Sequence, residues 1–197
     1  PNNIGDKDVI YIGATTSRDV PKIMAIASQG SSLYIYEISP EMIQGKKGTI
    51  CSGYWELTPE TGLVEGKLPV ATSAYFDRMF YYAVGNKIYR ADLTRSTPRS
   101  YEIYAHPDPS VRITRLKFRS QREDRWDISG GDEVEAIPYD FVSYLGGVAE
   151  YPDGNCSMLE MKLTAAGEID KEEGTKDLMV YEFKGFKNVV DFVYAFK

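Results

Sequence analysis

Short runs of alternating apolar and polar residues, separated by turn residues, recur along this chain. Residues 30–39 align without a gap with residues 85–94, and residues 155–164 follow the same pattern with one slip in the turn. Each copy is a turn followed by a period-two segment, and this periodicity predicts a β-strand. A sheet repeated in this way must stack on its neighbours to bury its faces, so the pattern is typical of a β-repeat protein.

Three further strands are predicted around each shared segment, so the repeat unit is a four-stranded antiparallel meander. The units span about residues 8–58, 72–105 and 111–184. The predicted flanking strands are a small apolar strand before the turn (23–27, 79–84, 144–149), an aromatic–Glu–apolar strand at the end (55–57, 101–103, 181–183) and a first strand (9–12, 112–118, with a weaker candidate at 74–76).

The fold class predicted from these units is all-β, with a β-propeller-like array of about three blades in a single domain over residues 1–197. Three blades do not close a ring, because propellers contain about four to eight. The array is therefore a partial propeller, and residues 189–196 are predicted as the first strand of a further sheet. A twisted β-sandwich built from the same meanders is the alternative.

Composition and charge exclude several classes of partner and cofactor. The chain has 23 Lys and Arg residues against 29 Asp and Glu residues, a net charge of −6, and no dense basic run, so nucleic acid is not an expected partner. Two cysteines and one histidine leave little for a structural zinc site. A disulfide between Cys51 and Cys156 is doubtful, because they lie in the first and third units. No P-loop or dinucleotide fingerprint occurs, and no cofactor is expected.

A polar insertion at residues 119–141 contains the densest acidic group of the chain. Asp124, Asp127 and Asp132 surround Gly130-Gly131, and hard carboxylate oxygens of this kind are ligands for Ca²⁺. Their spacing does not match an EF-hand loop, and Arg125 lies within the group. A solvated loop without a metal is therefore the favoured interpretation.

The same insertion carries the candidate ligand-binding residues, Trp126 and Tyr139, with Asp127 and Arg125 as hydrogen-bonding neighbours. A flat aromatic ring stacks on a sugar at low entropic cost while the polar neighbours bond its hydroxyl groups. The alternative is that Trp126 only pins the loop to the sheet.

Trp55 is not expected to contact a ligand, because it is the aromatic residue of the aromatic–Glu–apolar pattern, a position that Tyr101 and Tyr181 occupy in the other units. We predict that it packs on the outer strand of its sheet.

No catalytic residue is predicted. His106-Pro107-Asp108-Pro109 contains a base and a carboxylate, but its two prolines indicate a rigid turn and no nucleophile motif accompanies it. A glycosidase needs two carboxylates about 5 to 10 Å apart, and a sequence with 29 acidic residues does not single out one pair.

The C-terminal segment resembles a known family. It contains a strand at 158–163, the turn at 166–169 and then Val180-Tyr181-Glu182-Phe183-Lys184-Gly185-Phe186-Lys187. This segment is similar to the C-terminal region of the PKD-like family lipoproteins of Bacteroidetes, which end in a Gly-Phe-Gly-Lys type turn and a short apolar strand. Here Lys187 directly follows Phe186, so the second glycine is absent. The match covers the last quarter of the chain.

The resemblance implies an extracytoplasmic lipoprotein at the cell surface or outer membrane, often linked with the capture of glycans. It supplies no catalytic residue. The chain starts at Pro1 without Met or a leader, so we expect it to be the C-terminal part of a longer protein whose lipid anchor lies upstream.

The predicted function is therefore a non-enzymatic module that binds a glycan or another surface ligand through its long loops. One alternative is an assembly module that buries its open sheet edge by self-association or against the missing N-terminal part of the same protein. A carbohydrate-active hydrolase is the second alternative.

Overall fold

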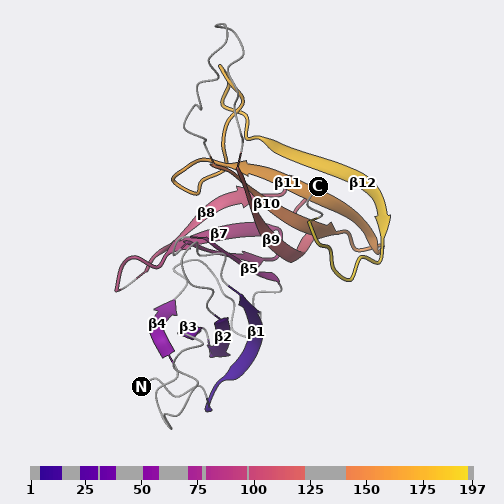
Figure 1. The fold of residues 1–197 in the computed structure, drawn as a ribbon. Coiled ribbons are helices and arrows are strands. Elements are labelled where there is room, and N and C mark those ends of the chain that lie inside the picture. Colours follow the sequence, from indigo (N-terminus) through magenta and orange to yellow (C-terminus); the bar gives the residue numbers. More distant parts are fainter. Residues whose placement is uncertain are drawn as a thin grey trace, which may run out of the picture.

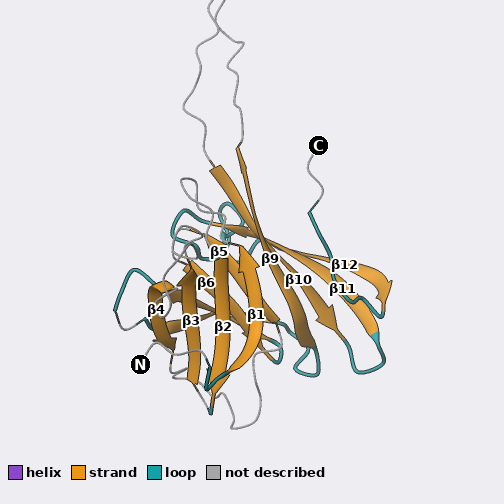
Figure 2. Ribbon diagram, turned by 60° about the horizontal axis from the view of Figure 1, so that its bottom comes forward, coloured by secondary structure: helices purple, strands orange, loops and turns teal. Residues whose placement is uncertain are grey.

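The computed structural model describes residues 5–14, 23–30, 32–38, 51–57, 71–76, 79–96, 98–122 and 141–194. Within these ranges the regular secondary structure is β-strand throughout, as Figure 2 shows, so the chain is all-β as predicted. The same ranges contain no helix with the length and hydropathy needed to cross a membrane.

The strands form three four-stranded antiparallel sheets in which each strand pairs with its neighbours in the sequence. Sheet A is β1–β4, sheet B is β5–β8 and sheet C is β9–β12. The strands are β1 (Asp8–Ala14), β2 (Ile23–Gln29), β3 (Ser32–Ile38), β4 (Cys51–Leu57), β5 (Ala71–Phe76), β6 (Met79–Val84), β7 (Lys87–Asp92), β8 (Ser100–Ala105), β9 (Arg112–Arg122), β10 (Phe141–Glu150), β11 (Asn155–Leu163) and β12 (Val180–Lys187).

Each sheet is thus one of the predicted meanders, and even the weak candidate at 74–76 is part of a strand. The first two shared turns begin with glycine at positive φ, 60° at Gly30 and 58° at Gly85. Asn86, the second residue of the Gly85-Asn86 turn, does not have a positive φ. A tight hairpin needs a left-handed residue at its first central position, and glycine adopts it without steric cost.

Sheet B lies between sheets A and C and buries both of its faces, an arrangement that Figure 1 shows. Side chains alternate along β6: Phe80 and Tyr82 pack with sheet A, whereas Tyr81 and Ala83 pack with sheet C. Successive side chains of a strand point to opposite faces, so a strand buried on both faces is apolar at nearly every position. The sequence MFYYAV of β6 fits this requirement.

The last strand of each sheet carries an aromatic residue at the equivalent position of the sequence pattern, but only the one in sheet A packs against a core. Trp55 on β4 is partly buried against the core between sheets A and B, as predicted. Its counterparts Tyr101 on β8 and Tyr181 on β12 are 48% and 43% exposed. Tyr101 and Tyr181 therefore do not share the packing of Trp55, although all three share the sequence pattern.

Residues 189–194 are not a strand, which corrects the prediction of a final strand at 189–196. They lie across one face of sheet C, where the Asp191 carboxylate is 3.0 Å from the Lys117 ammonium group. The Arg119 guanidinium lies between the rings of Tyr144 and Tyr194, at 4.6 and 5.0 Å from their centroids. These side-chain contacts hold this tail, residues 188–194, on the sheet without a strand partner among the described residues.

The insertion predicted at residues 119–141 is shorter than expected. The ladder between β9 and β10 continues to its ends, with Arg119 opposite Tyr144 and Arg122 opposite Phe141. Polar residues can extend a strand when the partner strand extends with them, because the backbone supplies the hydrogen bonds.

Candidate functional site

A cleft lies between sheet B and the connection that links β11 to β12. The connection is anchored on sheet B by two hydrogen bonds: the Tyr81 hydroxyl donates to the Gly167 carbonyl at 2.7 Å, and the Arg90 guanidinium donates to the Ala166 carbonyl. Gly167 has φ 77°, and a Cβ there would collide with the side chains of Met79 and Tyr81. Glycine is therefore needed at this point for the connection to approach the sheet.

The cleft has a volume of about 490 Å³ and a mixed lining. Volumes of this size are in the range of ligand-binding sites. The lining consists of four cationic residues (Arg90, Arg95, Arg99, Lys171), three acidic residues (Asp92, Glu102, Glu168) and four apolar or aromatic residues (Tyr101, Ile103, Ile169, Leu178).

Two of the three carboxylates are already engaged by neighbouring groups. Glu102 on β8 forms an ion pair with Lys87 on β7 at 2.7 Å, and Lys87 does not line the cleft. Asp92 accepts hydrogen bonds from the Thr94 hydroxyl at 2.6 Å and the Thr94 backbone at 2.9 Å. These bonds lower the pKa of Asp92, so it stays ionised. The lining thus holds four cationic side chains and three carboxylates, one of which is paired with a lysine outside the cleft, so the cleft has an excess of positive charge in a chain whose net charge is −6.

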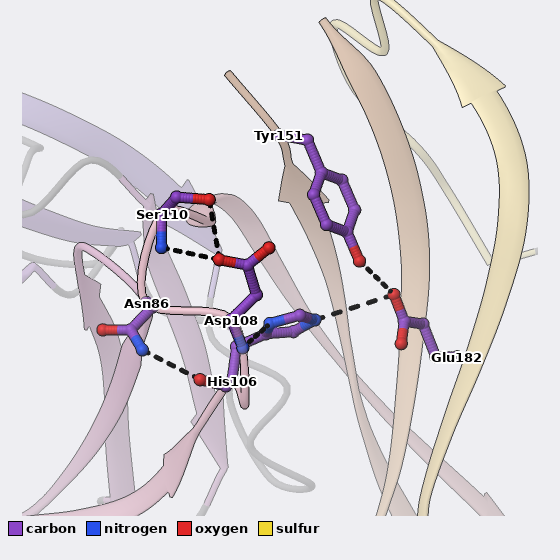
Figure 3. A network of polar contacts seen from close by, with 6 residues as sticks. All are labelled: Asn86, His106, Asp108, Ser110, Tyr151 and Glu182. Carbon is purple, nitrogen blue, oxygen red and sulfur yellow. Dashed lines mark hydrogen bonds and ion pairs between the residues drawn. The ribbon is translucent and has the colours of Figure 1, made fainter. Parts of the chain in front are cut away.

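A second polar site surrounds His106 in the turn between β8 and β9, shown in Figure 3. The backbone N–H of His106 donates to the Asn86 carbonyl at 2.8 Å, and the Asn86 side-chain amide donates to the His106 carbonyl at 2.9 Å. The imidazole Nδ1 accepts from the backbone N–H of Asp108 at 3.1 Å. His106 is buried, so these bonds satisfy groups that water does not reach.

The other imidazole nitrogen faces the sheet C carboxylate of Glu182. His106 Nε2 is 3.6 Å from Glu182 Oε1, which itself accepts a hydrogen bond from the Tyr151 hydroxyl at 2.9 Å. Burial raises the pKa of Glu182, but the Ser157 and Tyr151 hydroxyl groups, the charge of Lys184 and the nearby His106 ring outweigh it and lower this pKa. Because Nδ1 accepts a hydrogen bond, the neutral ring carries its proton on Nε2, directed at the carboxylate.

The His106 site does not have the geometry of a nucleophile–base–carboxylate triad. The Ser110 hydroxyl donates to the Asp108 carboxylate at 2.7 Å rather than to the imidazole. Asp108 contacts the imidazole through its backbone N–H, and its carboxylate is occupied by the Ser110 side chain and backbone. A triad needs the base in contact with both other groups. The arrangement instead ties the 106–110 turn to sheet C, and it fits the rigid turn predicted from the two prolines.

The ligand-binding residues predicted from the sequence, Trp126, Tyr139, Asp127 and Arg125, lie outside the described residues. The candidate calcium ligands of the acidic insertion lie there as well. Among the residues that the structure describes, no group of three or more His, Cys, Asp or Glu side chains is placed to hold a metal ion. Cys156 is a buried free thiol, and the side chain of Cys51 is not described.

Sequence reasoning missed the cleft. Three of its arginines lie at short intervals in and after β7, at positions 90, 95 and 99. This spacing was the only sequence pattern that pointed to a cationic site. Lys171 and Leu178 come from the connection about 80 residues further along the chain. Only the packing of the connection on sheet B brings the two groups together.

No family model, curated protein or solved structure matches the chain. Its function is therefore inferred from the geometry of its own residues and from the resemblance of its C-terminal segment.

Proposed function

We propose that this chain is a non-enzymatic binding module whose cleft between sheet B and the β11–β12 connection takes a glycan, in particular one that carries acidic groups. The observation that supports the proposal is the lining of the cleft, which joins three arginines and a lysine to an exposed tyrosine. Arginine binds carboxylate and sulfate groups through two parallel hydrogen bonds.

The remaining lining residues suit the other parts of a sugar. Tyr101 is 48% exposed at the cleft, and its ring offers a flat surface for the apolar face of a pyranose. Asp92 is held ionised and accepts hydrogen bonds, so it is a partner for sugar hydroxyl groups. Because sheet B is packed on both faces, these side chains are presented by a rigid support, which reduces the ordering cost of binding.

For the architecture, we propose that the three sheets are successive blades of a propeller-like array. Two observations support this: every sheet is a four-stranded meander, and the sheets pack in chain order with sheet B buried between the other two. Placement at the cell surface as a lipoprotein of the PKD-like family is part of the same proposal, and it is supported by the resemblance of residues 155–197.

The test is binding to an array of neutral, uronic-acid-containing and sulfated oligosaccharides. We expect binding to acidic oligosaccharides that falls at least about tenfold in Tyr101→Ala and in Arg95→Ala, a loss typical of a stacking or charged contact. The matched control is Tyr181→Ala, because Tyr181 holds the equivalent position on β12 with similar exposure, 43%, but does not line the cleft. The control should bind like the wild type.

The same array separates the alternatives. If Trp126→Ala loses binding and Tyr101→Ala does not, the binding site is in the insertion at residues 119–141 rather than in the cleft. Turnover of a bound oligosaccharide would favour the hydrolase. No binding to any oligosaccharide at millimolar concentration would reject the glycan proposal.

A further inference from the structure

The strand β12 forms an open edge of sheet C with unusually apolar exposed side chains. In the described part of the chain it pairs with β11 alone, and Figure 1 shows it in yellow at the margin of the molecule. Phe183 is 53% exposed, Phe186 44% and Tyr181 43%. An unpaired edge with large apolar side chains is a template for pairing with another strand, and soluble proteins usually protect such edges with charges or prolines.

The register of β12 on β11 shows which of its side chains share a face. Tyr181 is opposite Glu160 and Phe183 is opposite Met158, so the two aromatic rings lie on the face of sheet C away from sheet B. Glu182 is opposite Leu159, whose side chain packs in the core shared with sheet B. Tyr181 and Phe183 therefore form an exposed aromatic pair directly beside the free edge.

The sequence of β12 is self-complementary when it is read in the antiparallel direction about Phe183. The residues on either side of Phe183 are Glu182 and Lys184, which carry opposite charges. An antiparallel pair of two β12 strands centred on Phe183 places Glu182 of each copy opposite Lys184 of the other. Opposite charges across a strand pair are stabilising, and like charges are destabilising.

We propose that β12 is an interface for a second copy of this chain, with the two β12 strands paired antiparallel about a two-fold axis at Phe183. The two Phe183 rings then lie side by side at the axis. Tyr181 of each copy then approaches the bulge of the other copy at Gly185. Gly185 has φ 101° and no atom within 4 Å of the place where a Cβ would be, so no side chain there blocks the tyrosine ring.

Neighbouring registers are disfavoured by charge. Pairing centred on Glu182 places two carboxylates opposite each other, and pairing centred on Lys184 does the same with two ammonium groups. The Phe183-centred register removes both conflicts and adds two cross-strand ion pairs. A two-fold interface repeats each contact, so the ion pair between Glu182 of one copy and Lys184 of the other forms twice in the dimer.

The shared ladder is short, so the dimer is expected to be weak. The bulge between β11 and β12 lies at residues 184–185 and limits regular pairing to the residues around Phe183. Sedimentation velocity of the wild type from about 1 to 100 µM should therefore show a concentration-dependent rise from monomer to dimer mass. A monomer across the whole range would overturn the proposal.

Charge variants test the register. Lys184→Glu gives a strand with two carboxylates, and Glu182→Lys gives a strand with two ammonium groups, so each variant alone should dissociate at least about tenfold more readily than the wild type. An equimolar mixture of the two should recover a dimer, because each strand now faces its opposite charge. A mixture that stays monomeric would exclude this register.

Phe183→Lys is an independent variant that leaves Glu182 and its contact with His106 intact. It places like charges on the two-fold axis and should give a monomer, whereas Tyr101→Lys, an exposed tyrosine on the edge strand β8, should still form the dimer. Circular dichroism and thermal melting establish that each variant is folded. A folded Phe183→Lys variant with wild-type dimerisation would overturn the proposal.

Discussion

Gly146 on β10 shows how one missing side chain determines the path of the tail. A Cβ at this position would collide with the Tyr194 hydroxyl and lie 3.0 Å from the Phe192 ring. Both rings belong to the tail, and they contact each other edge to face. Glycine within a strand often marks a site where another part of the chain approaches closely. The tail therefore lies on sheet C because β10 leaves room for it.

Gly146→Ala should destabilise the protein by about 1 to 3 kcal/mol, because the added methyl group overpacks the site of Tyr194. Urea unfolding followed by circular dichroism measures this difference. The control is the same substitution in a Tyr194→Ala background, where the closest clash is removed and only the Phe192 ring remains near the methyl group, so the loss should be smaller. Equal losses in the two backgrounds would show that the tail does not constrain position 146.

At the scale of elements, side chains in turns connect the sheets. The turn between β8 and β9 holds His106, which contacts Glu182 on β12, and Tyr151 after β10 donates to the same carboxylate. The backbone of this turn is also bonded to the hairpin turn of sheet B through Asn86. Glu182 is thus a connection between the last strand of sheet C and the junction of sheets B and C.

The pKa of Glu182 is lowered in the folded chain, and this shift predicts that the folded chain loses stability in acid. The unfolded chain takes up a proton on this residue at a higher pH than the folded chain does. The stabilisation is therefore complete above the ordinary pKa of about 4.5 and is lost as the pH falls through the lower folded pKa. We expect the free energy of unfolding to fall with acidification in this window.

Glu182→Gln should reduce the slope of this pH dependence, measured by urea unfolding at a series of pH values between about 3 and 6. It should not abolish the slope, because Asp92, Asp108 and Asp191 also have lowered pKa values. Lys184→Gln is a graded test on the same strand: it removes a charge that lowers the pKa of Glu182 but leaves the carboxylate, so the slope should fall by less than in Glu182→Gln. An unchanged slope in Glu182→Gln would contradict the contact with His106 and Tyr151.

At the scale of the whole molecule, sheet B is the element on which the other two depend. Phe80 belongs to the core shared with sheet A, and Ile113 on β9 belongs to the core shared with sheet C. Both side chains are fully buried. Units that bury their faces only against one another share their stability, so the three sheets are expected to unfold together.

Phe80→Leu and Ile113→Val should each shift one common unfolding transition. The free energy of unfolding should fall by about 0.5 to 1.5 kcal/mol in Ile113→Val, which loses one methylene, and by more in Phe80→Leu, which loses the ring. Denaturant unfolding monitored by tyrosine fluorescence and by circular dichroism measures both. Two separate transitions, of which Phe80→Leu affects only one, would show that the sheets are independent.

Local sequence was sufficient for the strands of the three sheets and for their grouping, although it also predicted a strand at 189–196 where residues 189–194 are not in one. Alternation along 32–38 and 87–92, and glycine at the first turn position, fix a hairpin from interactions between neighbouring residues. The aromatic–Glu–apolar pattern predicted the last strand of each sheet but not the exposure of Tyr101 and Tyr181. Burial depends on what packs against a strand, and the local pattern does not contain that information.

The sequence by itself determined that this is an all-β chain of three meanders, because strand periodicity and turn chemistry act over a few residues. Only the tertiary structure decided the path of residues 189–194, which are apolar enough for a strand but are held by side-chain contacts with Lys117, Arg119 and Gly146. It alone also decided the cleft, since its walls come from segments about 80 residues apart and meet through the packing of Gly167 on Tyr81. Contacts of this kind arise from close approach in space, which no local pattern encodes.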